Sequence, residues 1–246
     1  MQTKLMRRRI AFLATFLFLS LLLAFIVGCG GGSEGKSAGE LSIEELWARV
    51  QEADANIKSM HMEIAGYYEN TQFGGGQIQS IILDFNSEDF HEQQILLGQV
   101  YCESIRIGDK YYAKDMDTGT WEEVPLESSS DTASEYTSRF LEIPSIAASQ
   151  ERLGTESIDE KDAEHYHFVL DTEGVTQLFS AQPSYDFSES EGGEVDMWID
   201  SSQYHLLRYD LVIRAILISE NIGYGDVRFI VNIRDINEPI EITPPI

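Results

Sequence analysis

Among the residues that could carry chemistry, Cys29 is the one whose neighbouring sequence indicates its role most clearly. It follows an apolar run from Ile10 to Val27, and that run is preceded by a basic start containing Lys4 and Arg7–Arg9. A basic segment, an apolar core and a small residue before the cut are the parts of a secretory signal. A cysteine at such a cut offers its thiol for covalent attachment of lipid.

The tetrapeptide Ile26-Val27-Gly28-Cys29 resembles the bacterial lipobox, in which a large aliphatic residue, a small pair and a cysteine mark the lipoprotein processing site. The resemblance implies that residues 1–28 are a signal peptide and that Cys29 is lipidated. Stable anchoring needs more than one acyl chain, which a diacylglyceryl-type cysteine provides. The alternative is an uncleaved anchor helix, because the apolar run is about as long as a short membrane span. Both interpretations place the rest of the chain outside the cytoplasm and close to a membrane.

The other reactive side chains form weaker patterns. His165 and His167 lie two positions apart on a predicted strand, so they share a face and could bind a metal with a third ligand. The alternative is a solvated strand face, with Tyr166 and Phe168 as the buried pair. Cys102 lies in an apolar-alternating stretch and is predicted to be a small buried hydrophobe. One thiol besides Cys29 cannot form an intramolecular disulfide.

Common catalytic motifs are absent from residues 41–246. This part of the sequence has no Gly-x-Ser-x-Gly, His-Glu-x-x-His, Walker-type or Gly-x-Gly-x-x-Gly pattern. The acidic loop from Pro183 to Gly193 has oxygen ligands and glycines, but it does not match the twelve-residue calcium loop. We therefore predict no enzyme activity, no metal site and no cofactor.

The charge balance restricts the partners. Residues 1–28 hold four of the 17 basic residues and none of the 42 acidic ones, so their removal takes the net charge from −25 to about −29. Such a domain repels nucleic acid and anionic lipid surfaces, and we predict no nucleic-acid partner. An apolar content of 43% is enough to build a folded core.

The chain divides into a tether and one domain. Residues 29–40 are the lipidated cysteine and a Gly/Ser-rich flexible tether, and residues 41–246 form the domain. Ser42 and Glu45 make a capping box at the start of a helix. Apolar residues at helical spacing continue from Ile43 to Ile57 and Met60, which predicts one long helix with a single apolar face.

From His61 onward the apolar period changes to two, which predicts strands. Short turns between the strands favour antiparallel meanders over parallel crossovers. Residues 127–156 are predicted as loop with a short helix or two before Pro144, and Thr172 is predicted to cap a short helix. The pattern indicates an α+β fold with one large curved antiparallel sheet. The predicted strands after the first cover residues 77–85, 94–107, 110–114, 121–124, 164–171, 194–199, 206–214 and 227–236.

Many aromatic residues fall in or beside the predicted strands. One explanation is ordinary sheet composition, because aromatic residues are enriched in strands. The other is that the curved sheet and the first helix enclose an apolar hollow for a lipid tail, since ligand sites are concave and mostly apolar. The residues predicted to line that hollow are Trp47, Val50, Ile57, Ile64, Trp121, Trp198 and Phe229.

Several segments in this order resemble the LppX/LprG-type lipoproteins of actinobacteria and, more distantly, the periplasmic lipoprotein carrier LolA. They are Ile57-Lys-Ser-Met-His-Met, Ile107-Gly-Asp-Lys-Tyr-Tyr, Val195–Asp200 with Leu206–Asp210, and the ending Asn237-Glu-Pro. The resemblance implies an open half-barrel sheet with helices across its concave face and an apolar cavity between them. Members of the family bind or carry lipids between membrane and envelope, and no catalytic residues are implied.

The leading hypothesis is an exported lipoprotein of the cell envelope that is anchored to a membrane by its N-terminal lipid. It would bind or carry a lipid or glycolipid in an apolar cavity between sheet and helices. The alternative is a non-catalytic surface interaction or sensor domain with a filled core. A third hypothesis is a hydrolase or metal site centred on His165 and His167. The sequence does not define protein partners.

Overall fold

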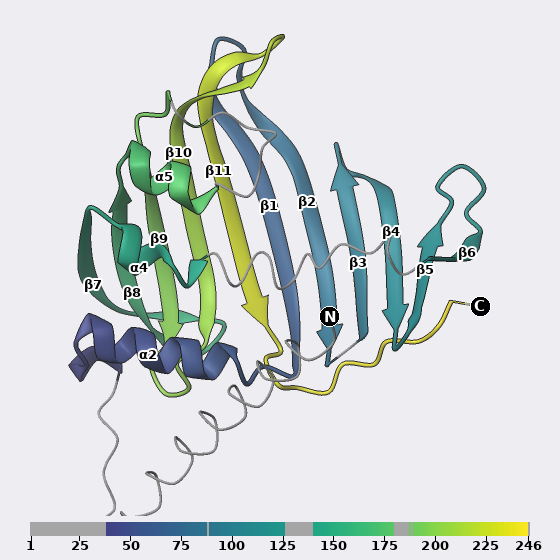
Figure 1. Cartoon of the computed structure of the whole chain (residues 1–246), viewed down its shortest axis with the longest axis horizontal. Helices are drawn as coiled ribbons and strands as arrows, with labels where there is room; N and C mark the ends of the chain where they lie inside the picture. The colour runs from purple at the N-terminus through teal and green to yellow at the C-terminus, as the bar shows by residue number, and fades with distance from the viewer. Residues whose placement is uncertain (1–37, 88, 126–139, 180–186, 188, 246) are drawn as a thin grey trace, which may run out of the picture. The chain divides into compact units, whose positions relative to one another are not determined.

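The computed structural model describes residues 38–87, 89–125, 140–179, 187 and 189–245 (Figure 1). The chain divides into two compact units, Met1–Gly35 and Lys36–Ile246, and the second holds every described element. The predicted signal peptide, Cys29 and the first part of the predicted tether lie outside the described residues. The second unit begins before the predicted boundary at residue 41. Ala38–Glu40 forms a 3-10 turn (η1), and Ala38 is buried and donates to the Ser201 carbonyl at 3.4 Å.

The fold is a single open antiparallel sheet of 11 strands, as predicted. Two meanders, β1–β6 and β7–β11, join where β1 pairs with β11, giving the order β6-β5-β4-β3-β2-β1-β11-β10-β9-β8-β7. In the described part of the chain no helix is long and apolar enough to cross a membrane. The strands are β1 Ser59–Thr71, β2 Gly74–Asn86, β3 Asp89–Leu96, β4 Gln99–Ile107, β5 Lys110–Lys114, β6 Trp121–Val124, β7 Ser149–Ile158, β8 Lys161–Leu170, β9 Gly193–Asp200, β10 Leu206–Ser219 and β11 Gly223–Arg234.

The first helix is shorter than the apolar spacing predicted. Helix α2 covers Ile43–Asp54, and its capping box is confirmed, with Ser42 Oγ accepting from the Glu45 N–H at 3.2 Å. Ile57 follows the helix, and Met60 is already in β1, so the prediction of one helix through Met60 was wrong. The apolar side chains at these two positions belong to a linker and a strand whose spacing happens to continue the helical pattern.

Two other predictions need correction because short turns and polar edge strands are hard to recognise. Residues 94–107 are not one strand, since Leu97 and Gly98, both with positive φ, make a tight turn between β3 and β4. Strand β7 was predicted as loop. It is the edge strand, and its side chains are mostly exposed, so it lacks the apolar alternation that marks a half-buried strand.

The remaining helices are short. Helix α4 covers Ile143–Ile146 and includes Pro144, which a first helical turn tolerates because the missing N–H has no partner there. Helix α5 covers Thr172–Leu178, and its cap is Asp171, which accepts from the Gly174 N–H at 2.8 Å, rather than the predicted Thr172. The helical residues predicted near Tyr136 and most of the acidic loop Pro183–Gly193 lie outside the described residues.

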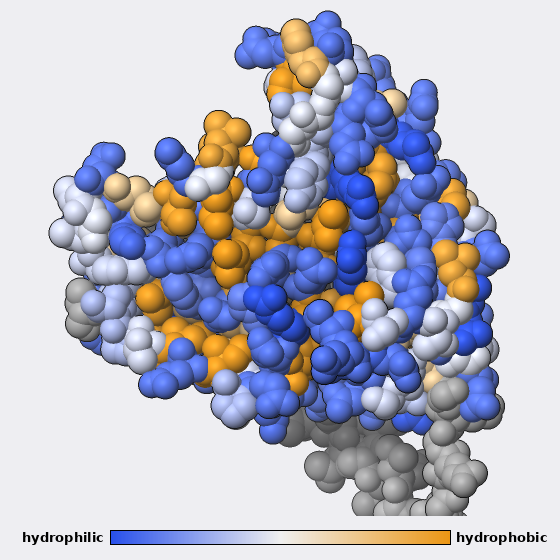
Figure 2. All heavy atoms as spheres, turned by 180° about the vertical axis from the view of Figure 1, so that it is seen from behind, coloured by the Kyte–Doolittle hydropathy of each residue, from blue (hydrophilic) through white to orange (hydrophobic). Residues whose placement is uncertain are grey.

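The sheet has two chemically different faces. Figure 1 shows α2, α4 and α5 in front of β7–β10, and we call this side the inner face. The other side, the outer face, is mainly hydrophilic with smaller apolar patches between (Figure 2). The sheet is curved, because the β7–β8 turn and the end of β11 line one pocket although β9 and β10 separate β8 from β11.

Candidate functional site

The inner face is a continuous apolar surface across six neighbouring strands. Alternate residues of β8, β9, β10, β11, β1 and β2 point to it, and the cross-strand register places them directly opposite one another. In β1 and β11, for example, Met62 lies opposite Ile233 and Ile64 opposite Val231. All four of these side chains are buried. The period of two in the sequence therefore becomes one broad apolar surface.

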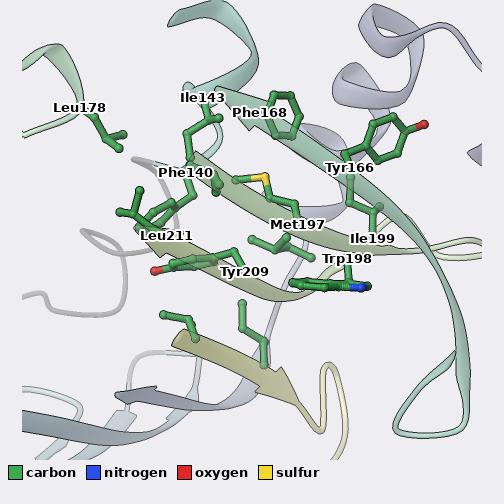
Figure 3. Close-up of a cluster of buried hydrophobic side chains, with 14 of the residues drawn as sticks. Phe140, Ile143, Tyr166, Phe168, Leu178, Met197, Trp198, Ile199, Tyr209 and Leu211 are labelled. Carbon is green, nitrogen blue, oxygen red and sulfur yellow. The ribbon is translucent and has the colours of Figure 1, made fainter. Parts of the chain in front are cut away.

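Helices cover the half of this face formed by β7–β10. Trp47 of α2 packs its ring edge on Phe168 of β8, with centroids 5.9 Å apart, and its indole N–H donates to the Leu141 carbonyl at 2.6 Å. Phe140 stacks on Tyr209 of β10 with centroids 3.6 Å apart. Figure 3 shows Phe140 and Ile143 directed toward the side chains of Met197 and Tyr209. This half is packed as a core.

In the half formed by β11, β1 and β2 most inner side chains are also buried, but two aromatic side chains are only partly so. Phe229 of β11 lies opposite Gly66 of β1 and remains half-buried. A Cβ at Gly66 would come within 3.3 Å of the Phe229 ring, so glycine leaves room for the ring to lie across the strand. Phe85 of β2 is also half-buried. This part of the inner face keeps apolar surface that a ligand could contact.

A pocket of ≈ 640 Å³ lies at one end of the inner face. Its apolar walls include Leu207 and Ile233, and the pairing of Ile233 with Met62 places Ile233 on the inner face. Charged side chains at the β7–β8 turn and after β11 also line it, among them Lys161 and Asp235. Pockets of this size are typical of small-ligand sites, and the mixture of walls fits a group that is apolar on one side and polar on the other.

The seven residues predicted to line the hollow divide between the two faces. Trp47 and Val50 of α2 are buried in the core, and Ile57 packs against it. Ile64 and Phe229 lie on the inner face. Trp121 and Trp198 do not join them, because their strand positions place both on the outer face.

Trp198 belongs to a polar cluster on the outer face. The ring of His165 stacks on it with centroids 4.3 Å apart, and its indole N–H donates to Glu156 at 3.0 Å. The imidazoles of His165 and His167 both contact Asp196 Oδ1, at 2.8 and 3.1 Å. Hydrogen bonds from Trp198 and then His165 lower the pKa of the Glu156 carboxyl. The two histidines thus share a carboxylate, as part of an ion-pair and hydrogen-bond network.

No group of three or more metal-ligating side chains is arranged as a metal site within residues 38–245, the gaps apart. Cys102 is half-buried on β4, so the prediction of a small buried hydrophobe was wrong. Burial, followed by the nearby charge of Glu92, raises the pKa of its thiol. A thiol that holds its proton more tightly is a weaker nucleophile.

Trp121 belongs to a second outer-face cluster, centred on Glu103. The ammonium of Lys114 lies 5.5 Å from the centre of the Trp121 ring and donates to Glu103 at 2.7 Å. Gln93 and His91 also contact Glu103, at 2.9 and 3.0 Å. Burial acts to raise the pKa of Glu103, but the hydrogen bonds of these three partners outweigh it and lower the pKa to about 2.

Glu103→Gln is expected to remove roughly 2 kcal/mol from the free energy of unfolding at neutral pH. Since the folded-state pKa is about 2 against 4.5, the carboxylate's contribution is complete above pH 4.5 and disappears as the pH falls toward 2. Urea unfolding across this range should show a steeper loss for the natural chain than for the variant. Glu122→Gln, an exposed neighbour on β6, is the matched control. Equal pH dependence in all three proteins would contradict the assignment.

Sequence reasoning overlooked most of the inner face. Phe168, Met197, Tyr209, Leu211 and Val231 are fully buried there, yet none was predicted to line the hollow. The signal that could have found them is the apolar alternation within each strand. Pairing between neighbouring strands then places these alternate residues on one face of the sheet. Choosing aromatic residues of predicted strands instead selected Trp121 and Trp198, whose rings contact partners on the outer face.

No protein-family model matches the chain. No curated protein matches it either. Several solved structures match the chain. Lipoprotein LppX from Mycobacterium tuberculosis is 17% identical, with 82% of this chain and 100% of that chain covered and a TM-score of 0.50. LprF from Mycobacterium bovis is 15% identical, covering 82% and 97% of the two chains with a TM-score of 0.48.

A LolA superfamily protein from Nitrosomonas europaea also matches, at 8% identity, 82% and 96% coverage and a TM-score of 0.30. Identities this low bear on the fold alone. The resemblance in the sequence and the open 11-stranded sheet agree at that level. The chain therefore has an LppX-like fold.

Proposed function

We propose that this chain is an exported lipoprotein, held on a membrane by lipid on Cys29, whose domain binds or carries lipid on its inner face. The observation that carries the proposal is the continuous apolar inner face with half-buried Phe229 and Phe85. The N-terminal sequence supports export and anchoring in the cell envelope. The LppX-like fold supports the proposal further, because LppX is itself a lipoprotein.

Lipid binding would place an acyl chain along the inner face of β11, β1 and β2. The polar head would lie toward the pocket at the end of β11, where Lys161, Arg234 and Asp235 stand beside Leu207 and Ile233. Moving a tail from a bilayer to this surface exchanges one apolar medium for another, so the net affinity is modest. Modest affinity suits a carrier, which must release its cargo. We propose no catalytic residue, no cofactor and no nucleic-acid partner.

A second candidate function is a non-catalytic interaction or sensor domain with a filled core. The observation that favours it is the packing of the β7–β10 half, where Phe168, Met197 and Tyr209 are almost inaccessible. If the whole inner face is filled in this way, the domain holds no lipid tail.

Native mass spectrometry of residues 36–246, the compact unit, distinguishes the two functions. The protein would be produced in a lipid-containing host and its bound molecules extracted afterwards. The carrier function predicts a co-purifying lipid or glycolipid at near-stoichiometric amount, which identifies the ligand class. A mass equal to that of the polypeptide, unchanged by added phospholipid or triacylglycerol, would favour the filled-core domain.

A further inference from the structure

Large apolar side chains are exposed mainly at one rim of the sheet. Eight are exposed in the described part of the chain, and six of these lie in or beside four hairpin turns at the same rim. The turns connect β1 to β2, β3 to β4, β5 to β6 and β10 to β11, and antiparallel pairing places them together. These six, which we call the apolar rim, are Phe73, Leu96, Leu97, Met116, Leu217 and Tyr224.

The most prominent part of the apolar rim is a double tip. Leu217 lies directly opposite Tyr224 in the β10–β11 hairpin. The β1–β2 hairpin, which carries Phe73, lies against it, and a Cβ at Gly225 would come within 2.5 Å of Thr71 Cγ2. Figure 1 shows these two hairpins extending beyond the neighbouring strands, and Figure 2 shows apolar side chains at their tip. Phe73 is 71% exposed there.

Three of the four hairpins that form the apolar rim are depleted of charge, and the β5–β6 turn is the exception, because Lys114, Asp115 and Asp117 surround Met116. Residues 70–83, 93–102 and 215–225 contain a single charged side chain, Glu220, although 24% of the chain is charged. Moving a charged group out of water is costly, so a surface that enters an apolar medium must lack charges. A solvated rim needs no such depletion, and ordinary solubility favours charges at exposed turns.

The opposite rim has the reverse character. Its turns carry exposed acidic residues, among them Asp109, Asp159, Glu160, Asp235 and Glu238. The described chain also begins there, because the Ala38 N–H donates to the Ser201 carbonyl in the β9–β10 turn. The two rims of the sheet therefore differ in chemical character. The rim next to the start of the described chain is charged, and the rim at the opposite ends of the strands is apolar.

We propose that the apolar rim docks on a lipid surface of neutral or zwitterionic headgroups. Phe73, Leu97 and Leu217 would enter the headgroup region, where removing their apolar surface from water is favourable. Within the hairpins of these three residues, Glu220 is the single charged side chain that would have to stay in water beside them. The strongly acidic remainder of the chain would keep the domain away from anionic surfaces. Docking at this rim would bring one end of the inner face to the surface that supplies or receives lipid.

The tether affects which membrane the apolar rim meets. The 13 residues of β1 span about 43 Å at about 3.3 Å per residue. Residues 29–37, fully extended, reach about 30 Å. With the strands upright on the anchoring membrane, the apolar rim therefore points away from it, toward a second lipid surface. A tilted sheet would place the same rim on the anchoring membrane, so both arrangements are tested.

A tryptophan probe tests the proposal in the full chain reconstituted in phosphatidylcholine vesicles. Phe73→Trp introduces the probe at the tip, and Asp109→Trp introduces the same probe at the charged rim as a control. Brominated phosphatidylcholine, which quenches tryptophan on contact, is placed either in the anchoring vesicles or in added protein-free vesicles. The natural chain corrects for Trp47, Trp121 and Trp198.

The proposal predicts loss of Phe73→Trp fluorescence in at least one of the two arrangements, and the arrangement identifies the membrane that is contacted. It also predicts that Leu97→Ser combined with Leu217→Ser reduces that loss, raising the vesicle concentration needed by about tenfold. No quenching of Phe73→Trp in either arrangement would overturn the proposal. Equal quenching of Asp109→Trp in the arrangement that quenches Phe73→Trp would also overturn it. A blue shift that depends on protein concentration without vesicles would assign the rim to a second copy instead. These outcomes are independent of lipid co-purification, so this proposal and the proposed function fail separately.

Discussion

Replacing Phe168 by alanine is expected to lower the free energy of unfolding by about 3–5 kcal/mol. The Phe168 side chain is fully buried on the inner face of β8, where Trp47 of α2 packs against it. Truncation removes the ring that connects the first helix to the sheet and leaves a cavity between layers that cannot fully collapse. The loss is large compared with the 5–15 kcal/mol by which a domain is normally stable.

Urea unfolding followed by tryptophan fluorescence measures this effect. Val169→Ala is the matched control, because Val169 is the next residue on the same strand, is partly exposed and points to the outer face. We expect it to cost about 1 kcal/mol or less. Similar losses for both variants would mean that the layer between α2 and β8 contributes no more to stability than the outer face does.

Replacing Phe229 by glutamine is expected to reduce the amount of bound lipid about tenfold. Phe229 is half-buried on the inner face opposite Gly66, in the half of the sheet that keeps accessible apolar surface. An amide in contact with an acyl chain has no hydrogen-bond partner, and such a group costs about 1–3 kcal/mol. Each 1.4 kcal/mol corresponds to a tenfold change in affinity. Lipid co-purifying with residues 36–246 is the quantity to be measured.

Ile230→Gln provides the control for that variant. Ile230 is the next residue of β11, is half-buried like Phe229 and points to the outer face. Lipid binding on the inner face predicts that Ile230→Gln retains the natural amount of lipid. Equal retention by both variants would move the lipid away from β11.

The sequence was sufficient for the sheet wherever one strand face is buried and the other is solvated. Met60, Met62 and Ile64 alternate with polar residues, and the strand they predicted is β1. Strand β7 was missed because an edge strand with both faces exposed shows no alternation of apolar and polar residues. Ile57 was placed in the helix because its position continues the apolar spacing of α2, although it lies in the linker between α2 and β1.

The functional surface was harder to predict, because its residues depend on pairing between strands distant in sequence. Ile64 lies on the inner face because β1 pairs with β11, more than 150 residues away. Trp198 is adjacent to Met197 in sequence, yet the two lie on opposite faces of β9, and only the register with Arg208 and Tyr209 tells which face is inner. The aromatic character of a strand residue alone could not make that distinction. Cys29 was recognisable for the opposite reason, since its motif is entirely local.

The central claim is that a lipid tail lies on the inner face of β11, β1 and β2. The most direct measurement is cross-linking of residues 36–246 to a fatty acid with a photoactivatable group in its tail, followed by mass spectrometry of the modified peptides. The account predicts labels on Phe229 or Phe85, the half-buried residues of this surface, competed by unlabelled lipid. Labels confined to outer-face residues such as Ile230 and Ile82, or labelling that unlabelled lipid does not compete, would contradict it.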